Sequence, residues 1–325
     1  MQQPAIVAEG LVKTFGTTKA LDGIDLEASE GAVLGLLGPN GAGKTTAIRI
    51  LSTLLEPDGG RAVVGGYDVL SSPGEVRRLI GLTGQYAAVD ELLSGRENLY
   101  MIGRLLGLRP KLARTRAMEL LEDLDLAGAA NKTVKTYSGG MRRRLDLASS
   151  LVGRPRFLFL DEPTTGLDPR SRLQLWSLIR ALVTDGTTVL LTTQYLDEAD
   201  HLADDIVVID HGRVIAQGTA DELKGRVGGQ VLEVGSADAG NLAQVASVLA
   251  ELSGTEGTID RDARIVTTPI ADTALVASAV RRLDASGVEV DHLSLRRPSL
   301  DEVFLSVTGH VDDEREQVEL ERSSV

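Results

Sequence analysis

The stretch that decides the fold is Gly38-Pro39-Asn40-Gly41-Ala42-Gly43-Lys44-Thr45. It matches the phosphate-binding pattern G-x-x-x-x-G-K-[ST] in full, between an apolar segment and an amphipathic one. Glycines let backbone N–H groups converge on a phosphate without a Cβ clash, and the N-terminus of the following helix favours an anion. Lys44 would reach the β- and γ-phosphates, Thr45 would place a hydroxyl on Mg²⁺, and Thr46 would donate to the α-phosphate. The alternative is a glycine-rich turn with a chance lysine.

Short apolar runs alternate with amphipathic stretches around this loop. The runs are bounded by Gly, Pro or charged residues and predict buried strands at Ala32–Leu37, Phe157–Leu160, Thr188–Thr192 and Ile206–Ile209. The 3.6-residue spacing predicts helices at Lys44–Leu54, Leu112–Asp123, Met141–Leu151 and Ser171–Val183. Strands separated by helices indicate an α/β domain with a largely parallel sheet. We expect it to span residues 1–225, with an inserted helical subdomain at about 90–150.

A second domain follows Gly228-Gly229. Its pattern predicts strand 230–234, helix 239–252, strands 255–260 and 263–268, helix 272–286 and strand 288–295, with a short helix at Ser299–Val307. The order βαββαβ is that of the split βαβ, ferredoxin-like fold. We therefore expect a small accessory α+β domain at 230–309. The charged residues 310–325 read as a disordered tail.

The composition limits the classes of protein. The 325 residues hold 47 acidic and 34 basic side chains, a net charge of −13, and no cysteine. This acidity argues against nucleic acid as a partner, and the missing cysteines exclude a disulfide scaffold or a thiolate zinc site. No apolar run approaches the roughly 18 residues that a membrane span requires. Residues 221–325 carry 20 acidic and 10 basic side chains, so most of the net charge lies in the last third.

A pair of carboxylates ends the predicted strand Phe157–Leu160. Asp161 and Glu162 lie where ligands of open parallel sheets bind. Asp161 would hold Mg²⁺, and Glu162, which faces elsewhere, would act on the attacking water. Taken alone, the pair could also be strand-end carboxylates in a solvated turn.

The segment Tyr137-Ser138-Gly139-Gly140-Met141 narrows the class of nucleotide hydrolase. It resembles L-S-G-G-Q, the signature of the ATP-binding subunits of ABC transporters, with Tyr for Leu and Met for Gln. Two glycines before a helix form a second anion-binding N-terminus, although a Ser-capped helix would look the same. Ser138 precedes Asp161 by 23 residues, a spacing typical of the family. The resemblance covers residues 5 to about 222.

The resemblance assigns roles to further residues. Gln85, 41 residues after Lys44, would be a catalytic residue and an Mg²⁺ ligand. Asp168 would contact the second subunit of a dimer, although it also reads as the N-cap of a helix. Phe15 would stack on adenine, or on guanine equally well, whereas an isolated phenylalanine would more often lie in a core.

The family also implies a mechanism and partners. Two copies would face head to tail, with Ser138, Gly139 and Gly140 of one copy acting on the ATP of the other. ATP binding would close this homodimer and hydrolysis would reopen it. A separate membrane permease would hold the chain peripherally at the cytoplasmic side of the cell membrane.

Four segments are similar to one subfamily, the daunorubicin/doxorubicin-resistance ATP-binding proteins. They are Thr83–Glu91, Tyr137–Asp146, Thr192–Asp200 and Ser299–Leu305. The similarity implies export of a hydrophobic drug or antibiotic, an assignment that rests on family analogy. The alternatives are a non-transport ABC ATPase of translation or DNA repair, and a nucleotide-dependent regulatory module. A single phosphate loop and the lack of sustained heptads disfavour the translation and repair types.

One position departs from the wider family. A histidine commonly lies about 32 residues beyond the catalytic glutamate, but Gln194 lies 32 residues beyond Glu162, and the histidines are His201, His211, His292 and His310. An amide can donate to a γ-phosphate but cannot become a cation as imidazole can. We therefore expect Gln194 to act in catalysis and basal ATP hydrolysis to be slow. The alternative is that Gln194 merely ends a strand and forms local hydrogen bonds.

Overall fold

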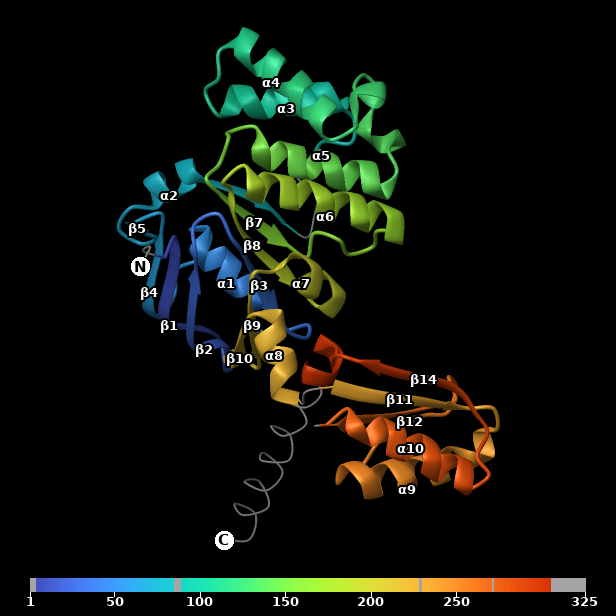
Figure 1. Ribbon diagram of the computed structural model, residues 1–325. Coiled ribbons are helices and arrows are strands. Elements are labelled where there is room, and N and C mark those ends of the chain that lie inside the picture. Colours follow the sequence, from blue (N-terminus) through green and yellow to red (C-terminus); the bar gives the residue numbers. More distant parts are fainter. Residues whose placement is uncertain (1–3, 85–88, 228–229, 271, 305–325) are drawn as a thin grey trace. The chain divides into compact units, whose positions relative to one another are not determined.

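The computed structural model describes residues 4–84, 89–227, 230–270 and 272–304. The chain divides into two compact units, an N-terminal unit, Met1–Thr219, and a C-terminal unit, Ala220–Val325 (Figure 1). Each unit has its own hydrophobic core. The division falls slightly before residue 225, where the sequence pattern had suggested the first domain would end.

A six-stranded sheet forms the centre of the N-terminal unit. Its strand order is β10-β9-β3-β8-β7-β6, and every neighbouring pair except β10–β9 is parallel. The strands are β3 (Val33–Leu37), β6 (Ile80–Thr83), β7 (Phe157–Asp161), β8 (Thr188–Thr193), β9 (Asp205–Asp210) and β10 (Arg213–Gly218). The predicted strands and the largely parallel sheet are confirmed.

The apolar runs are continuous because both faces of this sheet are buried. Along β7, Phe157 and Phe159 join one core cluster, whereas Leu158 and Leu160 join another on the opposite face. All four side chains are at most 1% exposed. Full burial of such a side chain contributes about 1.5–3 kcal/mol, so both faces stabilise the strand.

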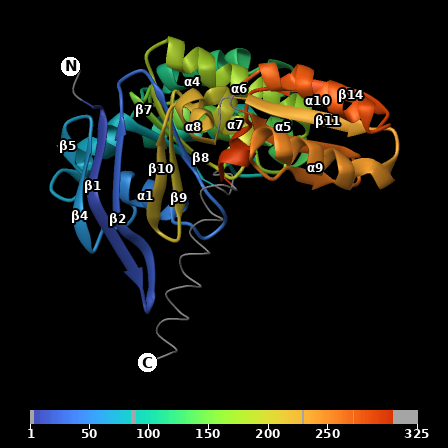
Figure 2. The ribbon, with the colours of Figure 1, turned by 60° about the horizontal axis from the view of Figure 1, so that its bottom comes forward.

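A second, antiparallel sheet lies beside the first. Its order is β2-β1-β4-β5, with β1 (Ile6–Phe15), β2 (Thr18–Ala28), β4 (Gly59–Val64) and β5 (Tyr67–Asp68) (Figure 2). Helix α1 (Lys44–Leu51) shares one core with both sheets, through residues such as Ile48 and Leu51. Helix α1, which follows the phosphate loop, is therefore fixed by packing against both sheets.

Helices build the remainder of the N-terminal unit. They are α2 (Pro73–Leu79), α3 (Gly95–Leu105), α4 (Pro110–Asp123), α5 (Gly139–Leu151), α6 (Pro169–Thr184) and α7 (Leu196–Leu202), with 3₁₀ turns at Ala127–Ala129 and Val134–Thr136. Helices α3, α4 and α5 form the expected helical insertion (Figure 1). A reciprocal capping box between Ser94 and Glu97 fixes the start of α3.

The C-terminal unit is a ferredoxin-like split βαβ fold, as predicted. Its four strands pair antiparallel in the order β12-β13-β11-β14, and α9 and α10 pack against the sheet. The elements are α8 (Ala220–Val227), β11 (Gln230–Ser236), a 3₁₀ turn (Ala239–Asn241), α9 (Leu242–Ser253), β12 (Thr258–Asp260), β13 (Ile265–Ile270), α10 (Ala274–Ala285) and β14 (Val290–Arg296). Residues 300–304 begin the expected last helix, and residues 305–325 lie outside the described part.

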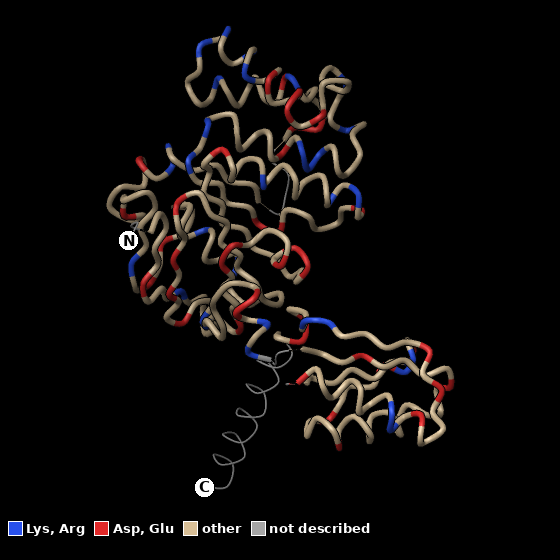
Figure 3. Tube along the Cα trace, viewed as in Figure 1, with Lys and Arg blue, Asp and Glu red and all other residues tan. Residues whose placement is uncertain are grey.

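Acidic and basic residues are spread along the chain in both units (Figure 3). Ion pairs join some of them, such as Arg213 and Asp22 at 2.8 Å. Within the described residues, no helix has both the length and the apolar character needed to cross a bilayer.

Candidate active site

The phosphate loop joins the end of β3 to the start of α1. Gly43 caps α1 with a φ of +111°, and a Cβ at this position would collide with the carbonyl of Ala20. Gly41 also has a positive φ, +85°. Only glycine adopts such conformations without strain, which accounts for both residues. The loop borders a cavity of about 130 Å³, lined by Ala20, Asn40, Gly41, Ala42, Gly43, Lys44, Thr45, Thr46 and Glu162.

The Lys44 side chain folds back across this loop. Its Nζ donates to the carbonyl oxygens of Gly38, at 2.7 Å, and Pro39, at 3.0 Å. The carboxylate of Glu162 lies 3.7 Å from the same nitrogen, and Lys44 is only 4% exposed. Burial lowers the pKa of Lys44, and the charges of Glu162 and Asp161 partly oppose that shift. The loop thus presents a fixed ammonium group at the cavity.

Asp161 ends β7 and receives two hydroxyl donors. Oγ1 of Thr45 lies 3.1 Å from its Oδ1, and Oγ1 of Thr192 lies 2.6 Å from the same atom. Mg²⁺ prefers oxygen ligands such as hydroxyl and carboxylate groups, so Thr45 and Asp161 fit that ion. Both lie beside the loop that would hold phosphate.

Glu162 adopts a left-handed backbone conformation, with φ +49°. Its N–H donates to the carbonyl and the hydroxyl oxygens of Thr192, both at 3.1 Å, and Thr165 donates to its Oε2 at 3.3 Å. A non-glycine residue in this region costs about 1 kcal/mol or more, and such strain clusters at functional sites. The turn directs the Glu162 carboxylate to Lys44.

Thr192 is a site residue that the motifs did not reveal. It pairs with Asp161 in the parallel ladder of β7 and β8, and it contacts both carboxylate residues. Its position near the carboxyl end of β8, beside β7, could have indicated this role, because ligands of open sheets bind at that edge.

The segment 138–140 begins α5 away from this cavity. Ser138 is the N-cap, and its Oγ accepts from the N–H of Met141 at 3.3 Å. Tyr137 anchors the turn, because its buried hydroxyl donates to the carbonyl of Ala129 at 2.8 Å. Ser138 and Gly139 are exposed, and neither lines the phosphate-loop cavity. The segment therefore does not contribute to the phosphate-loop cavity of its own subunit.

Comparison with known proteins decides the family. The family model "ABC transporter" matches residues 21–165, and "ATP-binding protein DrrA1-3-like, C-terminal domain" matches residues 218–308. The daunorubicin resistance ATP-binding protein DrrA3 of Streptomyces coeruleorubidus is 55% identical over 97% of this chain and 98% of its own. The daunorubicin/doxorubicin resistance ATP-binding protein DrrA of Streptomyces peucetius is 55% identical over 96% and 94%.

The chain belongs to the daunorubicin/doxorubicin-resistance subfamily of ABC transporter ATP-binding subunits. The resemblance inferred from its motifs is confirmed. An ATP-binding cassette crystallised as a dimer in a post-hydrolysis state with ADP and Pi has a TM-score of 0.61 and 25% identity, over 66% of this chain and 98% of its own. The N-terminal unit is thus the ATPase cassette, and this ABC subunit is an ATP-hydrolysing enzyme.

Gln194 directly follows β8, at the sheet edge that carries Asp161 and Glu162. Thr193, the last residue of β8, is buried, and its Oγ1 accepts from the N–H of Tyr195 at 2.9 Å. Gln194 itself is partly exposed. This position leaves it open to a nucleotide, and its role in the ABC ATPase stays a prediction.

The remaining predicted residues of the ABC cassette have varied surroundings. Phe15 ends β1 with half of its surface exposed, and Nζ of Lys13 lies 5.7 Å from the ring centre. Asp168 is the N-cap of α6, where it accepts from the N–H and hydroxyl of Ser171, which lowers the pKa of Asp168. The capping alternative for Asp168 is therefore observed, and its contact with a second subunit stays a prediction. Gln85 lies outside the described residues.

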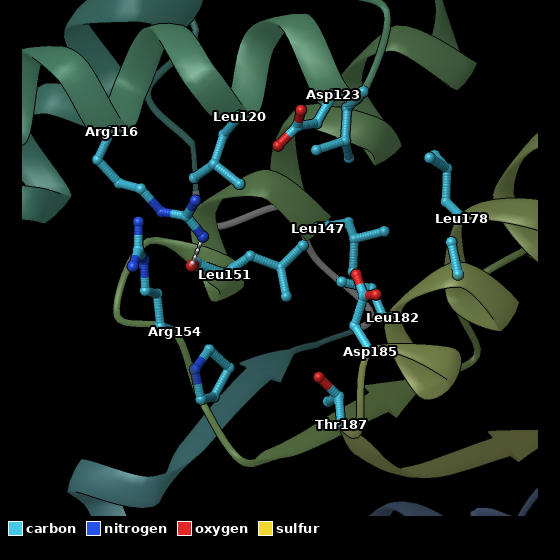
Figure 4. Close-up of a pocket in the computed structure, with 13 residues that line it drawn as sticks. Arg116, Leu120, Asp123, Leu147, Leu151, Arg154, Leu178, Leu182, Asp185 and Thr187 are labelled. Carbon is cyan, nitrogen blue, oxygen red and sulfur yellow. Dashed lines mark hydrogen bonds between the residues drawn. The ribbon is translucent and has the colours of Figure 1, made fainter. Parts of the chain in front are cut away.

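A larger cavity of about 680 Å³ lies among α4, α5 and α6 (Figure 4). Leucine side chains, including Leu120, Leu147 and Leu151, form much of its wall. Nη2 of Arg116 donates to the carbonyl of Leu151 at 3.0 Å at one side. None of the predicted site residues lines this cavity.

Proposed function

We propose that this ABC subunit hydrolyses MgATP to drive export of a hydrophobic drug or antibiotic through a separate permease. One observation carries the enzymatic part of the proposal. The fold brings Lys44, Thr45, Asp161 and Glu162 together at the carboxyl edge of one sheet, although more than a hundred residues separate the two pairs.

Each residue has a chemical role in the proposed reaction. The loop N–H groups and Lys44 bind the β- and γ-phosphates. Thr45, Asp161 and Gln85 would hold Mg²⁺, which would neutralise charge on the phosphate oxygens. Glu162 accepts a proton from the attacking water, and the Gln194 amide donates to the γ-phosphate. Phe15 stacks on the purine.

Dimerisation completes the site in this proposal. The exposed N-terminus of α5, at Ser138, Gly139 and Gly140, binds the γ-phosphate held by a second copy. Asp168 lies close to that interface. ATP then closes the homodimer because both copies contact the same phosphate, and hydrolysis removes the link. The dimeric, ADP- and Pi-bound cassette supports this arrangement.

The exported compound is proposed from the relatives. Two are named for resistance to daunorubicin or doxorubicin, and the relative from Ralstonia nicotianae is named a Nod factor export ATP-binding protein. A permease that spans the membrane would bind the subunit at the cytoplasmic side and supply the path for the compound. The energy would come from cycles of dimer closure and opening.

Transport in membrane vesicles tests the proposal. Inside-out vesicles containing this chain and a candidate permease should accumulate daunorubicin only when MgATP is present. Glu162→Gln vesicles should accumulate none, although both proteins are present in equal amounts. Accumulation that persists without this chain, or with Glu162→Gln, would contradict the proposed coupling. Normal ATP hydrolysis without accumulation of daunorubicin would contradict the proposed substrate.

A further inference from the structure

Arg143, near the start of α5, reaches four backbone carbonyls around the catalytic carboxylates. Its Nε donates to the carbonyl of Pro163 at 2.6 Å, and its Nη1 to that of Gly84 at 2.9 Å. Its Nη2 donates to the carbonyls of Asp161, at 3.1 Å, and Glu162, at 2.6 Å. The side chain is only 11% exposed. One buried group therefore joins the signature helix to the end of β7 and to the loop after β6.

These contacts bear on the conformation of Glu162. Carbonyls of successive residues point in opposite directions along an extended strand. The left-handed φ of Glu162 turns the chain so that the carbonyls of Asp161, Glu162 and Pro163 all meet one guanidinium group. On the other side, Thr192 holds the Glu162 N–H. Arg143 thus stabilises a turn that is unfavourable by itself.

Arginine suits this position for reasons of charge and shape. Burial lowers the pKa of Arg143, whereas the charge of Asp146, whose carboxylate lies 3.7 Å away, acts against that shift, as do the charges of Asp161, Glu198 and Glu162. The planar guanidinium offers five donors in a fixed fork, so it can bind several carbonyls at once. A lysine would keep the charge beside Asp146 but would concentrate its donors at one point.

We propose that Arg143 is a positioning residue that aims the Glu162 carboxylate at the attacking water. It does so by fixing the backbone at residues 161–163 and at Gly84, the residue that follows β6. The inference rests on the role proposed above for Glu162. It requires that loss of the fork lowers kcat without a comparable change in the KM for MgATP.

Turnover of the full-length protein tests this inference. Arg143→Lys should fold, because a positive charge remains beside Asp146. Its kcat should fall on the order of 10²-fold, the typical cost of a misplaced catalytic group, whereas its KM for MgATP should be nearly unchanged. Arg144→Lys is the matched control, since Arg144 is the next residue of α5, is 15% exposed and donates to Leu124 and Asp125 instead. It should keep the parent kcat. A folded Arg143→Lys protein with the parent kcat would overturn the inference.

A double variant distinguishes positioning from a general structural role. In single-turnover hydrolysis, adding Arg143→Lys to Glu162→Gln should slow the reaction little further, because Arg143 acts through the group already removed. Losses that multiply would show that Arg143 acts independently of Glu162 and would overturn the inference. If Glu162→Gln alone keeps the parent rate, the role proposed for Glu162 is wrong. If Glu162→Gln is inactive while Arg143→Lys is normal, only the positioning role is wrong.

Discussion

The two units use polar side chains in opposite ways. The N-terminal unit buries Lys44, Asp161 and Thr192 to 4% exposure or less. In the C-terminal unit, Ser236 and Thr268 are the buried polar residues among those described, and the cluster of Arg296, Glu233 and Glu302 is partly exposed. Buried charges are costly unless they are paired. Among the described residues, the buried charged side chains thus all belong to the first unit, whereas the second unit is buried mainly through its apolar core.

The largest expected difference between the two units comes from neutralising Glu162. Glu162→Gln keeps the size of the side chain but cannot accept a proton, so turnover should fall by roughly 10²–10⁴-fold, the usual contribution of a general base. ATP binding should persist, and the protein should elute as a dimer in MgATP. Steady-state hydrolysis beside size-exclusion chromatography measures both. Glu233→Gln in the C-terminal unit is the control and should change neither.

Gln194 gives the next largest expected effect. Gln194→Ala should lower kcat by on the order of 10²-fold, the typical cost of losing one donor to transition-state charge, and should weaken ATP binding less. Gln194→His should keep activity and add a dependence on pH near about 6.5, where unperturbed histidine titrates. Because the protonated imidazole carries the favourable charge, its activity should fall as the pH rises through that value. Parent-like hydrolysis by Gln194→Ala would assign Gln194 a structural role.

Sequence patterns identified the parts of the site that are contiguous in the chain. The loop 38–45 and the pair Asp161-Glu162 needed only local residue types and the strand before each. Thr192 was missed because its partner depends on the register between β7 and β8, which no local pattern contains. The reach of Arg143 was missed for a similar reason, since it depends on how α5 packs on the sheet.

Fold prediction succeeded for the same physical reason. Continuous apolar runs and a period of 3.6 residues mark segments that must be buried, so the four strands predicted for the six-stranded sheet and the βαββαβ order were correct. Strands β6 and β10 and the antiparallel sheet β2-β1-β4-β5 were not predicted. The ends of elements were less accurate: α1 ends at Leu51 where Leu54 was expected, and β12 begins at Thr258 where 255 was expected. The residues at the ends of helices and strands pack less against the core, so the pattern of apolar residues does not define where an element ends.

Thr192→Val tests whether the buried hydroxyl serves the proposed metal site. The change keeps the shape but removes the 2.6 Å hydrogen bond to Asp161 and the 3.1 Å bond from the Glu162 N–H, which also donates to the Thr192 carbonyl. Loss of such an outer partner typically weakens metal binding, so the Mg²⁺ concentration for half-maximal turnover should rise by roughly 10-fold. Thr188→Val, at the other end of β8, removes only the bond from the N–H of Gly31 and should leave the Mg²⁺ dependence unchanged. Equal behaviour of the two variants would contradict the role of Thr192.

The smallest expected effect lies in the C-terminal unit. Arg296 forms two hydrogen bonds with the Glu302 carboxylate, at 2.8 and 3.0 Å, and another with Glu233. Because Arg296 is about a third exposed, Arg296→Ala should destabilise this unit by only about 1 kcal/mol. Hydrogen exchange of the β11 and β14 amides measures that change. Turnover of ATP should remain at the parent value. Arg297→Ala, which removes an ion pair between the highly exposed Arg297 and Asp221, should change the exchange less.

The pH dependence of that unit provides the final test. Burial raises the pKa of Glu302, but hydrogen bonds from Arg296 and the Ser299 N–H outweigh it, so the pKa lies below its ordinary value of 4.5. A lowered pKa in the folded state means that the pair stabilises the unit fully above 4.5, and that this contribution is lost as the pH falls through the lowered value. The difference in amide exchange between the parent and Arg296→Ala should therefore shrink in acid. A difference that stays constant from neutral pH into that range would show that Arg296 stabilises the unit by packing instead of charge.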